Sequence, residues 1–164
     1  MSILVYMVTS YKLTNEVNLK ISKPKSYVTV DSVDRVLDCL AINIYREAAN
    51  ESFEGKVAVA QVVLNRVDHP SFPKDICEVI TQRNVIMGQV VCQFSWYCKN
   101  SSMRKPNNPE YRESYKVAKK VLLEGFRLDI LNDALYYHAV YVNPKWPYQR
   151  ITRIGNHIFY RAKK

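Results

Sequence analysis

The stretch from Glu54 to Val67, EGKVAVAQVVLNRV, constrains the fold more than any other part of this 164-residue chain. It predicts a helix whose apolar residues occupy nearly every side: Val57, Val59, Ala60, Val62, Val63, Leu64 and Val67. A helix that is apolar all round is normally buried at the centre of a domain. The two prolines of the following DHPSFP end it, because proline cannot continue a helix.

Further helices are predicted around this central one. Hydrophobic spacing indicates a preceding helix that begins at a cap, Asp31 or Ser32, and runs to about Ala49. KDICEVIT predicts one or two helical turns. The stretch 82–98 has no clear period and is expected to be an extended, ordered loop, and KNSSMRKPNNPE is the most loop-like segment of the chain.

The last third of the chain combines a helix with strands. Asn108 is expected to cap a helix that starts at Pro109 and ends at Gly125. ALYYHAVYV has strand composition, and ITRIGNHIFYR predicts a β-hairpin around Gly155–Asn156. We therefore expect one α+β domain over residues 31–164, with residues 1–30 as an N-terminal arm to which no role is assigned.

Glu47 lies on the apolar stripe of the first predicted helix. Leu40 and Ile44 precede it at helical spacing, and Glu47 is only about 20° from Leu40 around the helix axis. A carboxyl group facing a core has a raised pKa and can therefore serve as a general acid. The alternative is that Glu47 bends toward solvent or pairs with Arg46 or Arg66.

The chain has four cysteines, and their spacing does not predict a metal site. None of them forms a CxxC motif, and the three histidines do not complete zinc-ligand spacing with them. Cys39 lies in an apolar helix and is interpreted as a small core residue. Cys92 and Cys98 flank QFSWY and could close that loop in an oxidising compartment.

Charge is distributed unevenly along the chain. Residues 1–98 are balanced, whereas residues 99–164 carry the entire net charge of +9. This asymmetry predicts a polyanionic partner, either nucleic acid or an anionic polymer of the cell envelope, although a solvated basic surface explains it equally well. No stretch is long and apolar enough to span a membrane, and MSILVYMV lacks the flanks of a signal peptide.

Several blocks of the chain resemble SleB-type cell wall hydrolases, the spore-cortex-lytic enzyme family. That family shows Y-x-E-A-R-G-E, G-x-x-A-V-A-x-V-V-L-N-R-V, C-Q-F-S-W, Y-H-A-x-Y-V-x-P-x-W and I-G-x-H-I-F-Y. Here they read YREAANE, GKVAVAQVVLNRV, CQFSW, YHAVYVNPKW and IGNHIFY, in that order between Cys39 and Arg161. One block departs from the pattern, because EAANES replaces EARGE.

The resemblance implies a mainly helical, lysozyme-like fold with a small antiparallel sheet, and cleavage of peptidoglycan without a cofactor or metal. Glu47 matches the first glutamate of the family motif, which implies the catalytic acid of a lytic transglycosylase. The bond cut would join N-acetylmuramic acid to N-acetylglucosamine, giving 1,6-anhydro-muramyl products. A muramidase-type hydrolase that uses water is the alternative.

The resemblance also implies substrate contacts from other blocks. Glu51 matches the second family glutamate and could act as a second carboxylate, although a capping or solvent-facing role is favoured from its position in NES. Gln93 and Ser95 could bind N-acetyl or hydroxyl groups. The remaining candidates are aromatic: Phe94 and Trp96 for sugar faces, and Tyr137 and Tyr141, of which Tyr137 is expected beside the catalytic glutamate. His138 and His157 are interpreted as structural.

Two other classes of function remain as alternatives. A Cys-His cell-wall peptidase would use Cys92 or Cys98 as nucleophile and His138 as base, although no helix N-terminus is predicted to activate either thiol. A non-catalytic polyanion binder would use the basic half, but no nucleic-acid motif is present. As a whole, the chain resembles a monomeric bacteriophage endolysin. Such a protein is expected to stay in the host cytoplasm until a holin releases it to the periplasm and cell wall.

Overall fold

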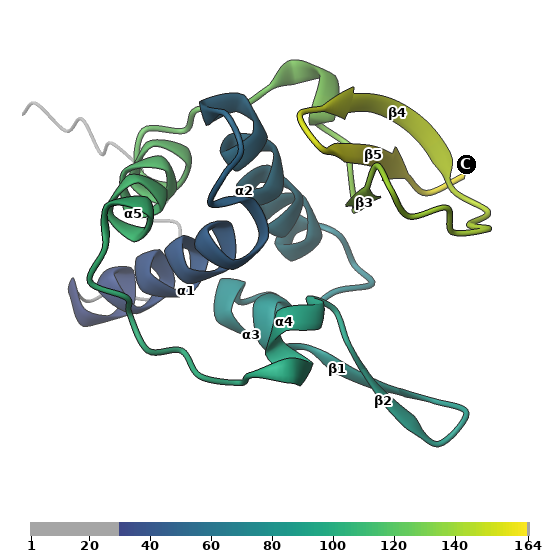
Figure 1. Ribbon diagram of the computed structural model, residues 1–164, viewed down its shortest axis with the longest axis horizontal. Coiled ribbons are helices and arrows are strands. Elements are labelled where there is room, and N and C mark those ends of the chain that lie inside the picture. Colours follow the sequence, from purple (N-terminus) through teal and green to yellow (C-terminus); the bar gives the residue numbers. More distant parts are fainter. Residues whose placement is uncertain (1–29, 164) are drawn as a thin grey trace, which may run out of the picture.

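The computed structural model describes residues 30–163, so the predicted arm at 1–30 lies almost entirely outside the described residues. Helix α2 (Phe53–Asp68) lies at the centre, with α1 (Val30–Ala48) beside it and α5 (Pro109–Leu122) packed against α1 (Figure 1). As predicted from its apolar composition, α2 is buried along most of its length. This buried position explains why its sequence has no polar face.

The few polar residues of α2 hold the chain that leads into the sheet. Gln61 accepts a hydrogen bond from the Leu128 backbone N–H at 2.8 Å. The Asn65 amide donates to the carbonyl oxygens of Leu131 and Ala134, at 2.7 and 2.8 Å. These bonds satisfy buried backbone groups around the 3₁₀ turn Asp129–Leu131 and so fix where the next strand begins.

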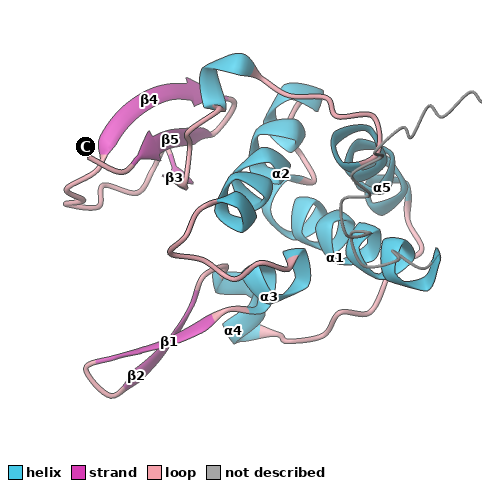
Figure 2. Cartoon of the chain, turned by 180° about the vertical axis from the view of Figure 1, so that it is seen from behind, coloured by secondary structure: helices cyan, strands magenta, loops and turns pink. Residues whose placement is uncertain are grey.

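The strands after that turn form an antiparallel sheet beside α2. Strands β3 (Tyr136–Ala139), β4 (Gln149–Ile154) and β5 (His157–Arg161) have the order β3-β5-β4. Seen from behind, this sheet lies on the opposite side of α2 from α5 (Figure 2). The predicted hairpin is confirmed, and Gly155 takes its left-handed turn position with φ of 56°. The predicted α+β class is confirmed as well.

The predicted loop at 82–98 was wrong. Strands β1 (Arg83–Ile86) and β2 (Gln89–Cys92) form a second hairpin there, followed by the short helix α4 (Ser95–Lys99). The alternation that marks a strand is missing because every residue of β1 is exposed. Its two-residue turn also places Met87 in the left-handed region, and methionine is not a turn signal.

The predicted helix boundaries are otherwise close to those observed. The short helix α3 spans Ile76–Thr81, and Asn108 caps α5 by accepting a bond from the Tyr111 N–H. The start of α1 was misplaced, since the helix begins at Val30 and therefore includes both predicted caps. None of the helices within residues 30–163 is long and apolar enough to span a membrane.

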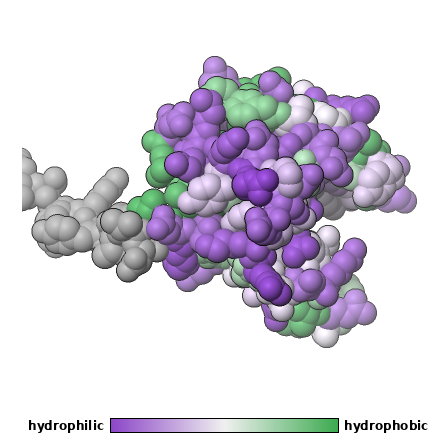
Figure 3. Space-filling view, turned by 60° about the vertical axis from the view of Figure 1, so that its left-hand side comes forward, coloured by the Kyte–Doolittle hydropathy of each residue, from purple (hydrophilic) through white to green (hydrophobic). Residues whose placement is uncertain are grey.

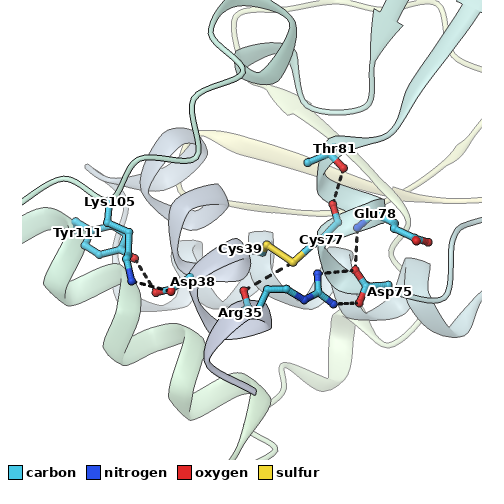
Figure 4. Close-up of a disulfide and its surroundings, with 9 residues drawn as sticks. All are labelled: Arg35, Asp38, Cys39, Asp75, Cys77, Glu78, Thr81, Lys105 and Tyr111. Atoms are coloured by element: carbon cyan, nitrogen blue, oxygen red, sulfur yellow. Dashed lines mark hydrogen bonds and ion pairs between the residues drawn. A yellow bond between two sulfur atoms is a disulfide. The ribbon is translucent and has the colours of Figure 1, made fainter. Parts of the chain in front are cut away.

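All four cysteines are paired in disulfides. Cys39 is buried as predicted, but it bonds to Cys77 and so links α1 to α3, a pairing that the sequence interpretation missed. Figure 4 shows the Arg35–Asp75 ion pair beside this disulfide, with N···O at 2.6 Å. Cys92 bonds to Cys98 and closes the loop that the sequence suggested.

Candidate active site

Glu47 lies at the C-terminal end of α1, where the apolar stripe meets the sheet. Its carboxylate accepts a hydrogen bond from the Tyr137 hydroxyl, with Oη and Oε2 3.0 Å apart. Tyr137 comes from β3, so two segments 90 residues apart in sequence meet here. Glu47 is half-buried, and its carboxyl group forms no ion pair with Arg46 or Arg66 within residues 30–163.

The surroundings of Glu47 keep its carboxyl protonated to higher pH than usual. Burial raises the pKa of the Glu47 carboxyl, and the hydrogen bond from Tyr137 and the positive charge of Arg66 partly oppose that rise. Burial beside Glu47 also raises the pKa of Tyr137, which therefore remains a hydrogen-bond donor. The site can thus hold a proton at rest and stabilise the anion once that proton has left.

Arg66 is a buried cation in this site that sequence reasoning considered only as an ion-pair partner. Its guanidinium carbon lies over the rings of Phe72 and Phe94, 5.3 and 5.1 Å from their centroids. Nε donates to the Leu135 carbonyl at 2.8 Å, whereas Nη1 has no hydrogen-bond partner among the described residues. Burial lowers the pKa of Arg66 to about 10. The signal in the sequence was a lone arginine near the end of an apolar helix.

Two neighbouring cavities meet at Glu47. One of about 550 Å³ extends toward Arg66 and the QFSW loop, and one of about 350 Å³ extends toward Glu51 and Asn156. Both are lined by the same five residues: Arg46, Glu47, Ala139, Tyr141 and His157. A polymeric substrate could therefore extend to both sides of the carboxyl group.

Glu51 has a structural environment that differs from its predicted capping role. Ser52, not Glu51, caps α2 through a bond from the Gly55 N–H. The Glu51 carboxylate instead accepts from the backbone N–H and the side-chain amide of Asn156, at 3.1 and 3.0 Å. It ties the start of α2 to the β4–β5 turn while bordering the smaller cavity.

The absence of a side chain at Gly155 makes this contact possible. A Cβ added there would collide with the Glu51 carboxylate. The position also has positive φ, so glycine is required for both conformation and space.

The QFSW loop borders the larger cavity with all four of its residues. Gln93 is half-buried and Ser95 is exposed, so both can offer polar groups to a ligand. Phe94 and Trp96 are only 2% and 9% exposed, and the Trp96 indole donates to Asn43 at 2.9 Å. The expectation of open sugar-stacking faces therefore needs correcting, because both rings are packed into the protein and leave little surface for a ligand.

The sheet supplies the opposite wall of the larger cavity. Tyr141 is 88% exposed just beyond β3, and Trp146, which sequence reasoning did not select, is 40% exposed. His138 has both ring nitrogens bonded, Nδ1 donating to the Ala139 carbonyl and Nε2 accepting from the Tyr160 hydroxyl. This histidine is therefore committed to structure. Burial lowers the pKa of His157, which packs edge-on against Tyr137.

The disulfides remove the thiol alternative. Cys92 and Cys98 are bonded to each other, and all four cysteines of the chain are paired, so no thiolate is present to attack a peptide bond. A Cys-His peptidase mechanism would also need His138 as its base, and that ring is fully hydrogen-bonded. Glu47, by contrast, is a carboxyl group that faces both cavities and whose pKa is raised by burial.

Comparison with known proteins connects this geometry to one family. A cell wall hydrolase family model matches residues 50–160, which include Glu51 and the QFSW loop and begin after Glu47. The spore cortex-lytic enzyme of Bacillus subtilis (strain 168) is 33% identical over 132 residues. That of Bacillus cereus (strain ATCC 14579) is 32% identical over 127 residues. The alignments cover 73% and 75% of this chain but 35% and 43% of those proteins, so the chain spans less than half their length.

Two solved structures share the fold. The catalytic domain of the Bacillus cereus SleB protein superposes with a TM-score of 0.58 at 26% identity, covering 78% of this chain and 91% of that one. The catalytic domain of the germination-specific lytic transglycosylase SleB from Bacillus anthracis gives a TM-score of 0.60 at 26% identity, covering 86% and 100%. The helices and small sheets described above are therefore the architecture of that catalytic domain.

Proposed function

The chain belongs to the SleB-type cell wall hydrolase family of cell-wall lytic enzymes, and from this premise we propose that it is a lytic transglycosylase acting on the glycan strands of peptidoglycan. The bond cut joins N-acetylmuramic acid to N-acetylglucosamine. The observation that carries the proposal is the half-buried Glu47 carboxyl, bonded to Tyr137 at the junction of two cavities. Sugar units on either side of the cut bond would occupy one cavity each.

In the proposed first step, Glu47 donates its proton to the glycosidic oxygen. The bond from that oxygen to C1 of the muramyl residue breaks, N-acetylglucosamine leaves with a free 4-hydroxyl, and positive charge develops at C1. Glu47 becomes a carboxylate at this moment. The Tyr137 hydroxyl and the positive charge of Arg66 stabilise that carboxylate. These are the same two groups that partly offset the rise in the Glu47 pKa before the reaction.

In the second step, the Glu47 carboxylate removes the proton of the muramyl C6 hydroxyl, whose oxygen attacks C1. A 1,6-anhydro ring forms and Glu47 regains its proton, so one carboxyl serves as acid and then as base. No second carboxylate is needed, because the nucleophile belongs to the substrate. The engagement of Glu51 by Asn156 supports this single-carboxyl mechanism.

Mass spectrometry of the fragments released from purified peptidoglycan tests the proposal. Wild type should release anhydro-muramyl products, Glu47→Gln should release none, and Glu113→Gln on exposed α5 should behave as wild type. Reducing-end muramyl products would instead make the enzyme a hydrolase and turn attention to Glu51. Cut peptide stems, or equal release by Glu47→Gln, would refute the assignment.

We also propose that the protein works in the cell envelope as an endolysin. Both disulfides would persist in an oxidising compartment such as the periplasm, in keeping with release from the host cytoplasm through a holin. The basic C-terminal half would attract anionic envelope polymers. Thiol labelling before and after triggering a holin tests this idea: free thiols should disappear only after release, and lysis without a holin would argue against it.

A further inference from the structure

The β1–β2 hairpin carries an exposed apolar tip. Five large apolar side chains lie there, with these exposed fractions: Val85 73%, Ile86 54%, Met87 100%, Val90 59% and Val91 44%. The hairpin projects from the helical body in Figure 1, and the corresponding lower end of the molecule shows hydrophobic surface in Figure 3. An exposed apolar cluster of this kind normally marks an interaction surface.

The protein body holds this hairpin only at its foot. The Gln93 N–H donates to the Gln82 carbonyl at 3.0 Å, and the Cys92–Cys98 disulfide joins β2 to α4. Beyond that foot, both faces of the ribbon are in water, and a two-stranded ribbon is marginally stable by itself. The chain also keeps methionine at a left-handed turn position, where asparagine or glycine would suit the backbone better. Stability of the free protein therefore does not explain the apolar tip.

The apolar residues occupy both faces of the ribbon. Val85 pairs with Val90 on one face, while Ile86 and Val91 lie on the other, because successive side chains alternate. A groove or sheet edge of a protein partner would cover one face and leave the other in water. A lipid bilayer surrounds an inserted tip from every side, so it accommodates this distribution.

The segment of the chain that contains the hairpin carries basic side chains and lacks acidic ones. Between residues 79 and 109 there is no acidic residue, whereas Arg83, Lys99, Arg104 and Lys105 are basic. Lys105 pairs with Asp38, and the other three form no ion pair within residues 30–163. Arg83 lies about 13 Å behind Met87, at roughly 3.3 Å per strand residue. If the tip enters a bilayer by about 5–10 Å, Arg83 reaches the level of the lipid phosphates.

We propose that the β1–β2 hairpin inserts its tip into the surface of an anionic phospholipid bilayer and anchors the protein there. Apolar insertion and attraction of the basic foot to lipid phosphates together supply the two contributions that stable peripheral binding needs. The strand β2 continues directly into the QFSW loop, so the anchor holds the cleft beside the membrane. The proposal stands independently of the reaction proposed for Glu47.

Co-sedimentation of the full chain with vesicles tests the anchor. Vesicles of phosphatidylglycerol and phosphatidylethanolamine should pellet the wild type, and vesicles of phosphatidylcholine should pellet far less. The combined variant Val85→Ser, Ile86→Ser and Met87→Ser should lower the partition coefficient roughly a hundredfold. Its matched control, Leu123→Ser with Ile130→Ser, removes exposed apolar side chains at 53% and 58% exposure elsewhere and should bind as wild type.

The electrostatic contribution is tested separately. Arg83 lies in β1, and Lys99 ends α4, which the Cys92–Cys98 disulfide joins to β2. Arg83→Gln with Lys99→Gln should weaken binding to the anionic vesicles by about thirtyfold at low salt and less at high salt. Equal binding by the tip variant and the wild type would overturn the proposal, because the basic surface alone would then account for binding.

Insertion of the tip into the bilayer is measured by the fluorescence of a tryptophan introduced there. Met87→Trp should add a blue-shifted emission that brominated phospholipids quench, whereas Ile130→Trp should not. Failure of quenching at Met87→Trp would overturn the proposal even if the protein pellets. Self-association of wild type in solution that is lost in the serine tip variant would also overturn it, because the hairpin would then be an interface between copies of the chain.

Discussion

Glu47 and Glu51 lie one helical turn apart in sequence, but their carboxyl groups have opposite surroundings. Glu47 lies half-buried in the last turn of α1, accepts one hydrogen bond from Tyr137 and borders both cavities. Glu51 lies between two glycines and accepts two N–H donors from Asn156. Both carboxyl groups border the smaller cavity, so a position beside a cavity does not by itself identify the proposed proton donor. The proposed acid is Glu47, a carboxyl group whose pKa is raised by burial.

The largest expected effect separates the two glutamates by activity. Glu47→Gln should lower kcat/KM by about 100- to 10,000-fold, because the proton donor is lost while the shape is kept. Glu51→Gln should keep roughly a tenth or more of wild-type activity, because the Glu51 carboxylate holds Asn156 and takes no part in the proposed proton transfers. Release of soluble glycan fragments measures both. Equal inactivation of the two variants, with both folded, would remove the distinction.

The next effect separates them by stability. Gly155→Ala should lower the free energy of unfolding by about 1–3 kcal/mol, because its Cβ displaces the Glu51 carboxylate and a positive φ is strained. Urea denaturation measures this change. Gly125→Ala is the control, since it shares the positive φ but has no atom within 4 Å of an added Cβ. If both variants lose the same amount, the Glu51 contact contributes nothing beyond backbone strain.

A smaller effect concerns the pH profile. The Tyr137 hydroxyl lowers the pKa of Glu47, so Tyr137→Phe should raise that pKa further. The alkaline limb of kcat/KM, where Glu47 loses its proton, should then move to higher pH, while kcat falls about tenfold because the carboxylate loses its donor. An unchanged alkaline limb with a lower kcat would mean that Tyr137 acts on substrate and not on Glu47.

The smallest expected effect is a gain in the free energy of unfolding when Glu47 is replaced by glutamine. Because the folded-state pKa of Glu47 is raised, its contribution to stability is full at low pH and is lost as pH rises through that pKa. Glu47→Gln stays neutral, so it should be about 1 kcal/mol more stable than wild type at neutral pH and equal to it near pH 4. Thermal unfolding across pH measures the difference. A constant difference at every pH would show that desolvation of the charge is not its cause.

The local parts of the fold could be predicted from the sequence. The buried helix α2, the cap at Asn108 and the turn at Gly155 each depend on residues within a few positions of one another. The β1–β2 hairpin could not be predicted, because methionine occupies the first position of its Met87–Gly88 turn and its strands lack a buried face. The Cys39–Cys77 pairing was missed for a related reason, since spacing along the chain does not report the distance between two helices.

The candidate site shows the same division between local and long-range information. Helical periodicity by itself determined that Glu47 follows the apolar stripe of α1, and composition determined that α2 is central. Only the tertiary structure decided that Tyr137 contacts Glu47, that Arg66 lies buried beside them, and that Asn156 engages Glu51. The physical reason is that periodicity is set by neighbours along one helix. Desolvation and hydrogen bonding depend on groups that packing brings together from distant parts of the chain.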